Sequence, residues 1–361
     1  MNNAKSKKQF DDDSSYEQPS LQIMTTTKLC STDGSWSDEN DEHDPLREEE
    51  SEKEEESESS LSALERTIPW IGVLVWPLMS TVPLLLSSEY SPISYQDIFP
   101  VSWYEFEPNG GRPQPLGLIL GLLAVGVGQF WVCFFFYLFK YGYLSARKEP
   151  LSIQTKGARV YDFMEGLLTH LAQVEGFVLL MSYLTITWMT GIMPKAYYTF
   201  DGTIQYKELF LCLLIQDGLQ YTVHLLEHIV SPSFYQISHK PHHRFINPRL
   251  FDAFNGSFLD TICMVVIPLF LTSQIVRNCN VWTYMSFGSS YSCWLTLIHS
   301  EYAFCWDGMF RLLGLGTPAD HHVHHKFFKF NYGHLFMWFD RLAGTYRNPR
   351  SFAPRVFNSK V

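Results

Sequence analysis

Long apolar runs, separated by short polar connections, constrain this chain more than any other feature of its sequence. Several of them approach the roughly 20 residues that an α-helix needs to cross the hydrocarbon core of a bilayer. The sequence therefore predicts an all-α integral membrane protein, built as a multi-span helical bundle. The candidate spans are Ile68–Leu86, Leu116–Phe139, Phe163–Met193, Leu209–Val223, Leu259–Val276 and Val281–Ile298.

The first 66 residues have the opposite character. They hold 19 acidic and 7 basic side chains and end in a run rich in glutamate. A segment of this composition buries too little apolar surface to offset the entropy lost on ordering it. We expect residues 1–66 to be a disordered acidic tail, followed by an N-terminal transmembrane region over residues 67–206.

Basic residues in the connections predict the orientation of the spans. They cluster in Lys140–Arg159 and in Lys240–Arg249, whereas Ser87–Pro115 and Pro194–Tyr206 carry few of them. Lysine and arginine are enriched in the cytosolic loops of membrane proteins. We therefore expect both basic connections, the C-terminal segment and both termini on the cytosolic side.

Histidines are concentrated in the second half of the chain, where eleven of the 13 lie between His224 and His334. An H-x3-H pair on a helix places both imidazoles on one face. In an H-x2-H-H box, we expect the first two histidines to share a helical face while the third turns roughly 100° away. One short segment could then reach two neighbouring metal ions. The boxes are His224-x3-His228, His239-x2-His242-His243 and His321-x2-His324-His325, and His299 stands alone between the last two.

The number of these histidines predicts two metal ions. The boxes supply eight imidazoles and His299 supplies a ninth. Neutral imidazole is a ligand for zinc, copper and iron, and nine ligands exceed the four of a tetrahedral zinc site. Outside the boxes, we expect His170 to be a hydrogen-bonded core residue and His43 to be solvated, while His334 fits either interpretation.

The three boxes resemble those of the fatty acid hydroxylase/sterol desaturase superfamily of membrane di-iron oxygenases. So do the runs Ile298-His299-Ser300-Glu301-Tyr302, Asn331-Tyr332-Gly333 and Trp338-Phe339-Asp340-Arg341-Leu342-Ala343-Gly344-Thr345. The resemblance covers about Leu211 to Pro349. It implies a catalytic domain over residues 207–349, a C-terminal tail over 350–361, and a cytosolic cap in which the histidine boxes hold two metals. The implied iron ligands are His224, His228, His239, His242, His243, His299, His321, His324 and His325.

Three further residues belong to this expected site. His322 is a possible extra ligand, because it falls inside the third box. Asp217 lies seven residues before His224 and therefore on the same helical face, where a carboxylate could accept the free ring N–H of a ligand. Asp340 is a similar candidate. Ordinary capping, or pairing with Arg341 or Arg347, would explain the two aspartates equally well.

The resemblance also implies a reaction and its partners. It predicts an O2-dependent monooxygenase or desaturase with two iron ions, which receives electrons from NAD(P)H through cytochrome b5 and its reductase at the endoplasmic reticulum membrane. The chain has no dinucleotide-binding glycine motif after a strand and no His-Pro-Gly-Gly haem-binding sequence, so the electrons must come from other proteins. Lys326, Lys329 and Arg341 would suit the docking of such a carrier. No nucleic-acid partner is expected.

The implied substrate is a membrane lipid. The run from Phe327 to Gly333 resembles that of sterol C-5 desaturases, but Leu250–Ser257 stands where those enzymes usually carry a further His-Pro. This departure leaves room for a divergent branch of the sterol and isoprenoid pathway, of which the alternative squalene epoxidases are one. Squalene epoxidation, sterol-ring oxidation by C-5 desaturation or 4-methylsterol oxidation, and fatty acyl hydroxylation stay open. A histidine-rich membrane metal transporter is the alternative of another class, and its ligands should lie near the bilayer midplane.

Overall fold

The computed structural model describes residues 85–87, 93–105, 113–144, 152–154 and 162–352. The expected acidic tail lies outside these residues, as does the candidate span Ile68–Leu86 except for its last two residues. Within the described part the chain is helical, and it contains two isolated β-bridges but no strand. The predicted all-α class is confirmed for this part of the chain.

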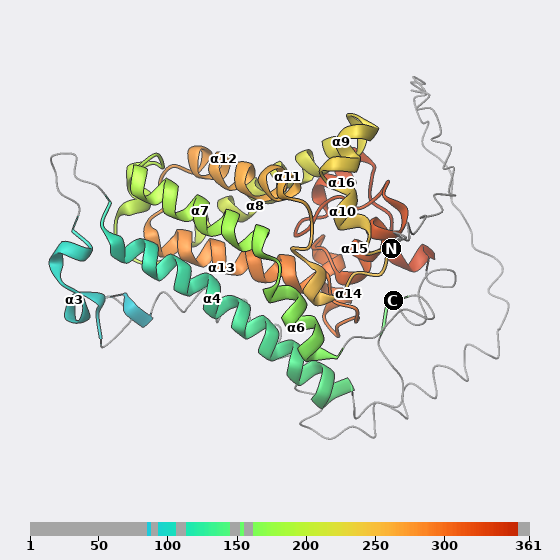
Figure 1. Ribbon diagram of the computed structural model, residues 1–361, viewed down its shortest axis with the longest axis horizontal. Coiled ribbons are helices and arrows are strands. Elements are labelled where there is room, and N and C mark those ends of the chain that lie inside the picture. The colour runs from blue at the N-terminus through green and yellow to red at the C-terminus, as the bar shows by residue number, and fades with distance from the viewer. Residues whose placement is uncertain (1–84, 88–92, 106–112, 145–151, 155–161, 353–361) are drawn as a thin grey trace, which may run out of the picture. The chain divides into compact units, whose positions relative to one another are not determined.

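Long helices run alongside one another and form a bundle (Figure 1). Three of them, Pro115–Tyr143, Tyr206–Ile229 and Phe258–Ile275, are long and apolar enough to cross a membrane. Two of the three contain a π-helical segment, η3 (Phe139–Tyr143) in the first and η6 (Ile262–Val266) in the third. The helices of the bundle are α4 (Pro115–Leu138), α6 (Phe163–Leu171), α7 (Val174–Thr190), α8 (Tyr206–Ile229), α11 (Phe258–Thr261), α12 (Ile267–Ile275) and α13 (Val281–Leu297).

The predicted span Phe163–Met193 is divided into two helices, α6 and α7, in the structure. The division falls at Ala172 and Gln173, where the backbone of Gln173 leaves the helical region with φ −81° and ψ 70°. The Gln173 side chain bridges to a distant segment at this point, because its Nε2 atom donates to the carbonyl oxygen of Phe251 at 3.0 Å. In contrast, α8 extends beyond the predicted span Leu209–Val223, because the same helix continues through the first histidine box.

Helix α13 lies at the centre of the bundle, and most of its residues are buried. It begins at Asn280, whose side chain accepts a hydrogen bond from the backbone N–H of Thr283. Small serines on its faces allow neighbouring helices to approach closely, and the Ser289 hydroxyl donates to the Ala124 carbonyl of α4 at 3.1 Å. The predicted helix Val281–Ile298 is thus present, but as a core helix surrounded by the others.

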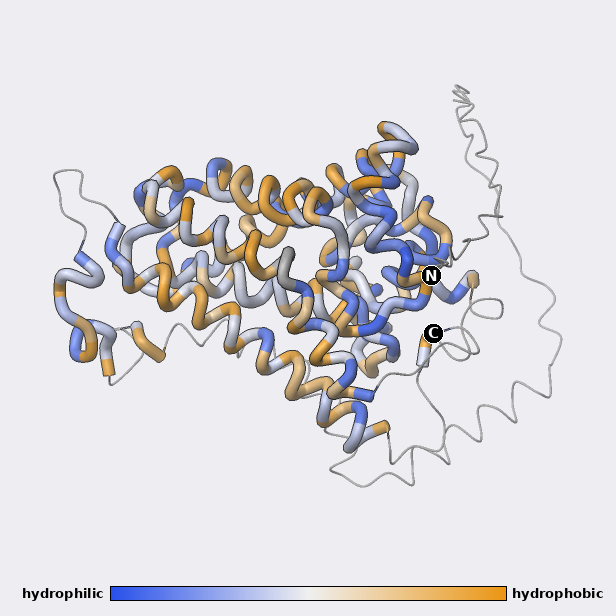
Figure 2. The backbone as a smooth tube through the Cα atoms, in the orientation of Figure 1, coloured by the Kyte–Doolittle hydropathy of each residue, from blue (hydrophilic) through white to orange (hydrophobic). Residues whose placement is uncertain are grey.

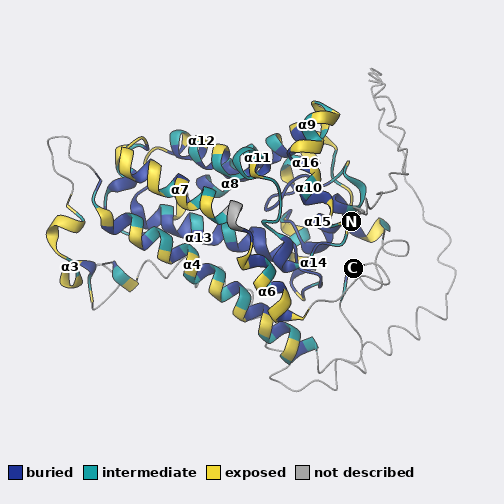
Figure 3. Cartoon of the chain, viewed as in Figure 1, coloured by how far each residue is buried: buried dark blue, intermediate teal, exposed yellow. Residues whose placement is uncertain are grey.

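Short helices gather at one end of the bundle, and hydrophilic residues are concentrated there, whereas apolar residues line the helices of the bundle itself (Figure 2). Exposed residues lie on the outer faces of α4 and α7 (Figure 3). Helix α3 (Tyr95–Ile98) lies at the opposite end. The short helices are α9 (Pro232–Ile237), α10 (Lys240–His243), α14 (Asp307–Leu313), α15 (Pro318–Phe327) and α16 (Trp338–Ala343), and the remaining turns are η2 (Val101–Trp103), η4 (Lys195–Tyr198), η5 (Leu250–Asp252) and η7 (Pro349–Phe352).

Candidate metal centre

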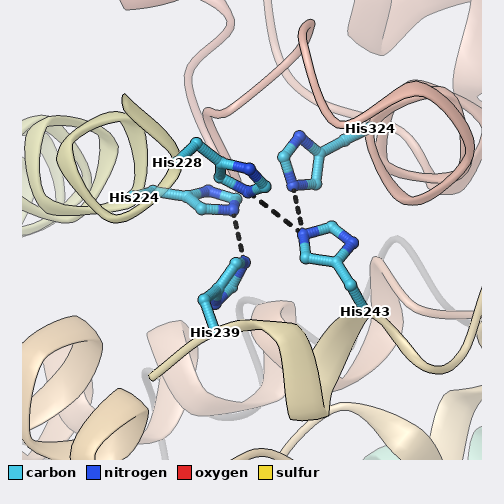
Figure 4. A group of neighbouring side chains, drawn as sticks. All are labelled: His224, His228, His239, His243 and His324. Carbon is cyan, nitrogen blue, oxygen red and sulfur yellow. Dashed lines mark hydrogen bonds between the residues drawn. The ribbon is translucent and has the colours of Figure 1, made fainter. Parts of the chain in front are cut away.

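The structure brings all nine histidines of the expected ligand set together, in two adjoining groups. Within each group the candidate ligand nitrogens lie within 4.8 Å of one another. The groups adjoin where the ring centroids of His243 and His325 lie 4.8 Å apart. Group A, shown in Figure 4, contains His224, His228, His239, His243 and His324, and group B contains His242, His299, His321 and His325.

The second and third boxes each contribute to both groups, which is how short segments serve two sites. The division of each box between the groups differs from the prediction, in which the first two histidines of an H-x2-H-H box lie on one helical face. In the structure His239 joins His243, and His321 joins His325, while the middle histidine of each box turns to the other group. The physical reason is that residues four apart on a helix are separated by about 40°, whereas residues three apart are separated by about 60°.

The ring nitrogens of these histidines are oriented as a cation requires. The Nδ1 atom of His224 lies 2.7 Å from the Tyr332 carbonyl oxygen, and that of His239 lies 2.7 Å from Asp260 Oδ1, so both Nδ1 atoms carry the proton and donate. Their Nε2 atoms are then bare lone pairs, and they face each other at 2.9 Å (Figure 4). Two lone pairs repel at this distance unless a positive ion lies between them, so this donor set fits a metal.

Group B has the same arrangement. His299 Nδ1 lies 2.7 Å from the Leu295 carbonyl oxygen and donates to it, which leaves Nε2 as the lone-pair atom. That Nε2 faces His321 Nε2 at 3.0 Å and His242 Nε2 at 3.4 Å. In group A, His324 Nδ1 likewise donates to the Phe330 carbonyl oxygen at 2.9 Å. Backbone carbonyls therefore fix the tautomer of several of the expected ligands.

Burial keeps these imidazoles uncharged. It lowers the pKa of His239 to about 3 and that of His242 to about 4. The pKa values of His321 and His325 are held well below their ordinary value, first by burial and then by neighbouring imidazoles. A neutral imidazole at physiological pH offers its lone pair without first losing a proton, as metal binding requires.

Two carboxylates beside group A were missed by the sequence reasoning. Asp260 accepts the hydrogen bond from His239 Nδ1, and a Glu227 carboxylate oxygen lies 3.6 Å from the same nitrogen. Both side chains are buried. The available signals were weak: Glu227 directly precedes His228, and Asp260 lies three residues after Ser257, whose hydroxyl caps the start of α11.

Asp217 and Asp340 both accept hydrogen bonds from backbone N–H groups near the end of the chain. The Asp217 carboxylate accepts from the backbone N–H groups of Leu335 and Phe336, both at 2.8 Å, and not from a ring nitrogen. Asp340 accepts from the N–H groups of Tyr332 and Gly333, at 2.9 and 2.7 Å. Such binding of backbone N–H groups is the capping role that the sequence left equally open for both aspartates. Together the two aspartates tie down the segment whose Tyr332 carbonyl accepts from His224.

Helix α15 carries three of the expected ligands, and its start is fixed by a reciprocal cap. The Thr317 side chain accepts from the Asp320 N–H, and the Asp320 carboxylate accepts from the Thr317 N–H. Asn331 connects this helix to the closing segment, because its amide donates to the carbonyl oxygens of Asp320 and Arg347. These bonds fix the rotation of α15 and hence the division of its histidines between the groups.

Three further histidines of the described residues lie outside both groups, and His43 is not among the described residues. The possible extra ligand His322 belongs to neither group, and its Nε2 atom lies 3.1 Å from the Ser300 carbonyl oxygen. His334 lies between the groups, with its ring centroid 5.2 Å from those of His224 and His321. His170 is buried against Phe177, Phe251 and Phe254, as expected for a core histidine.

Two small cavities adjoin between the interior of the bundle and the two histidine groups. A cavity of about 50 Å³, called the metal-side cavity below, is lined by residues of both groups, among them His239 and His299. A second cavity of about 90 Å³, the inner cavity, lies among the bundle helices and is lined almost wholly by apolar residues. Phe254, Val265 and Leu295 line both cavities. These three side chains thus lie between the interior of the bundle and the histidines.

Comparisons with known proteins point to one family. The fatty acid hydroxylase family model matches residues 209–345, which contain all nine histidines of groups A and B. A protein of Phaeodactylum tricornutum named alternative squalene epoxidase is 71% identical over 302 residues, which are 83% of this chain and 86% of the relative. A Delta(7)-sterol 5(6)-desaturase of Aspergillus fumigatus is 31% identical over 149 residues, 36% of this chain and 45% of its own length. One of Saccharomyces cerevisiae is 29% identical over 196 residues, 50% of each chain. This chain thus spans about half the length of these two desaturases, and no solved structure matches it significantly.

Proposed function

The chain belongs to the fatty acid hydroxylase family, and on this premise we propose that it is a membrane oxygenase that converts squalene to its epoxide. Its relatives are enzymes, and they make the chain an oxidoreductase of the sterol pathway. The observation that supports squalene most directly is the 71% identity to a protein named alternative squalene epoxidase. The apolar inner cavity, which shares three lining residues with the metal-side cavity, supports a hydrocarbon substrate independently.

Two iron ions are the proposed metals, one in each histidine group. Group A offers five imidazoles and group B offers four, and imidazole is a suitable ligand for iron. When bound, the irons would activate dioxygen, which the external electrons reduce, and would provide the oxidising power needed to attack an unactivated C=C or C–H bond. The overall reaction consumes squalene, one O2, two electrons and two protons, and it yields the epoxide and one water.

The chain's own residues position the substrate and exclude water. Phe254, Val265 and Leu295 line the junction of the two cavities, where a double bond would face the histidine groups. Among the polar groups near this junction, the Tyr291 hydroxyl donates to Asp217 at 3.0 Å and also contacts Gln220. These polar atoms are therefore engaged with one another, and the inner cavity offers the substrate an almost wholly apolar surface. Orienting one double bond beside the metals is the main contribution expected of such a pocket.

The electrons are proposed to come from NAD(P)H through a cytochrome b5 and its reductase at the cytosolic face of the endoplasmic reticulum membrane. Lys329 is exposed and Lys326 is half-buried at the end of α15, which also carries ligands of both groups. Arg341 is exposed as well, although one of its nitrogens donates to the Arg311 carbonyl oxygen. A basic surface this close to the metals suits an acidic electron carrier. In this arrangement both termini lie in the cytosol.

The decisive experiment supplies squalene to the purified full-length protein in vesicles, with NADPH, cytochrome b5, its reductase and ¹⁸O2. We expect squalene monoepoxide containing one labelled oxygen atom. The matched control is the His299→Ala variant, which removes a ligand of group B and should form no epoxide. Unlabelled product, or equal product from the variant, would contradict the proposal.

Sterol C-5 desaturation is the second candidate. The run Phe327–Gly333 resembles that of sterol C-5 desaturases, and several relatives are named Delta(7)-sterol 5(6)-desaturases. The same assay distinguishes the two reactions when a Δ7-sterol replaces squalene. Desaturation would yield a sterol with one more double bond and no label, with both oxygen atoms released as water. Conversion of the sterol without conversion of squalene would transfer the assignment to this second reaction.

A further inference from the structure

A groove lies between α4, α6 and α7 and opens to the surface of the bundle. Its volume is about 590 Å³, much larger than that of the inner cavity. The described residues that line it include no Asp, Glu, Lys or Arg, and most are aromatic or aliphatic. A groove of this size and composition suits a long hydrocarbon body and disfavours a charged head group.

The rim of the groove consists of exposed apolar side chains. Phe130 on α4 is 64% exposed, and Tyr137, Leu171 and Met181 around the same groove are also exposed. The groove belongs in part to Pro115–Tyr143, one of the three helices apolar enough to cross a membrane. Exposed aromatic and aliphatic groups on such a helix are in their preferred solvent when they face lipid chains. The groove is therefore open to the hydrocarbon of the bilayer.

The groove adjoins the cavities that lie between it and the histidines. Val125, Leu180 and Leu184 line both the groove and the inner cavity. The inner cavity in turn shares Phe254 and Leu295 with the metal-side cavity. Shared walls thus connect the lipid-facing surface, through two cavities, to residues of both groups.

The packing of α4 and α7 explains why the groove opens where it does. Far from the histidines the two helices are in close contact, because Trp188 of α7 packs against Gly117, where a Cβ atom would lie 2.0 Å from the indole. The Trp188 Nε1–H also donates to the Gln114 carbonyl oxygen at 2.8 Å. Towards the histidines lies the start of α7, where the helical interruption at Gln173 separates it from α6. The groove lies beside this break and is lined by residues of all three helices.

We propose that this groove is the port through which a neutral hydrocarbon substrate leaves the bilayer and reaches the histidine groups. The occupant is the lipid that the enzyme oxidises, and naming it squalene rests on the proposed function above. An uncharged, flexible chain can enter along the groove without bringing a charge into the bundle. Leu180 and Leu184, at the junction of the groove with the inner cavity, are the side chains that must change rotamer to admit it.

Gly126→Phe is the substitution that tests the port. Gly126 is exposed and lines the groove, and a Cβ atom placed on it meets no heavy atom within 4 Å. The added ring therefore fills the groove without a backbone clash. Met181→Trp narrows the groove from α7 and serves as a second variant. The matched controls are Gly308→Phe, the same substitution at an exposed glycine with equal space on α14, and Leu123→Phe, on a face of α4 that does not line the groove.

Two readouts are needed. The first is the KM for squalene presented in vesicles, which we expect to rise about tenfold or more in both groove variants, with iron per chain unchanged. The second is labelling by a photoactivatable octadecane diazirine dissolved in the same vesicles. In the wild-type protein we expect label on Met181 at the rim and on Met285 in the inner cavity. In Gly126→Phe the label on Met285 should fall by a similar factor, and the controls should match the wild type.

The two readouts separate the port from the proposed function. If squalene is not oxidised but the labelling pattern is as described, the port stands and the squalene assignment fails. If squalene is epoxidised and neither its KM nor the label on Met285 changes in Gly126→Phe and Met181→Trp, the substrate enters elsewhere. That result would overturn the port and leave the epoxidase assignment intact.

Discussion

Asp260 allows a quantitative test of how the protein holds its proposed metals. Its carboxylate accepts from His239 Nδ1 at 2.7 Å, and both side chains are buried. A hydrogen bond to a charged group contributes about 1.5–3 kcal/mol. Removing the group that orients a metal-bound histidine typically costs 10- to 100-fold in metal affinity, or about 1.4–2.7 kcal/mol. The two ranges agree, so we expect the loss in Asp260 variants to fall between these limits.

The two possible substitutions should rank in a definite order. In Asp260→Asn an amide oxygen can still accept the His239 N–H, and only the charge is lost, so the loss of iron affinity should be about tenfold. In Asp260→Ala the buried N–H is left without a partner, and the loss should approach 100-fold. The assay is the iron content of purified protein after dialysis against a graded series of chelator concentrations.

The control is Asp307→Asn. Asp307 is also a buried aspartate, but it accepts from the backbone N–H of Phe304 and not from a histidine. We expect this variant to retain iron like the wild type, whatever its effect on thermal stability. Equal iron retention in the wild type, Asp260→Asn and Asp260→Ala would refute the reasoning. If Asp260→Asn retained less iron than Asp260→Ala, the role of the hydrogen bond would be refuted.

Three further outcomes follow from the same structure. His242→Ala and His324→Ala, which each remove one imidazole from a different group, should abolish turnover while the protein remains inserted in the membrane; full activity in both would contradict a shared metal centre. Deletion of residues 1–60 should leave specific activity unchanged, because the expected acidic tail offers no ligand, and a large loss at equal protein level would show that it takes part. Glycosylation acceptors engineered into an extended 194–206 loop should be modified, and acceptors placed after His325 should not, since our topology puts the first segment in the lumen and the second in the cytosol. Modification at the C-terminus would exclude that topology.

Most of the helices and the histidines that gather in two groups were predictable because both depend on local chemistry. A continuous apolar run predicts a helix wherever it packs, and α4 begins and ends close to the predicted Leu116–Phe139. Histidines spaced by three or four residues predict ligands on one helical side. The nine histidines named from spacing and resemblance are the nine that the structure gathers in two groups.

The division of the histidines between the groups depends on the tertiary structure. Spacing fixes the angle between two side chains on one helix, but the rotation of α15 is set by distant contacts such as that of Asn331 with Arg347. The break between α6 and α7 is of the same kind, because the Gln173 side chain bonds to Phe251, far along the chain.

The hydrogen-bond acceptors of the ligand rings were also decided by the fold alone. His224, His299 and His324 donate to backbone carbonyls. Every residue has a carbonyl, so no residue type marks these positions in the sequence. The same holds for the route between the groove and the histidines, because its walls come from apolar residues of different helices. Residue type determines which atoms can bind a metal, and only the packing of distant segments determines which of them meet.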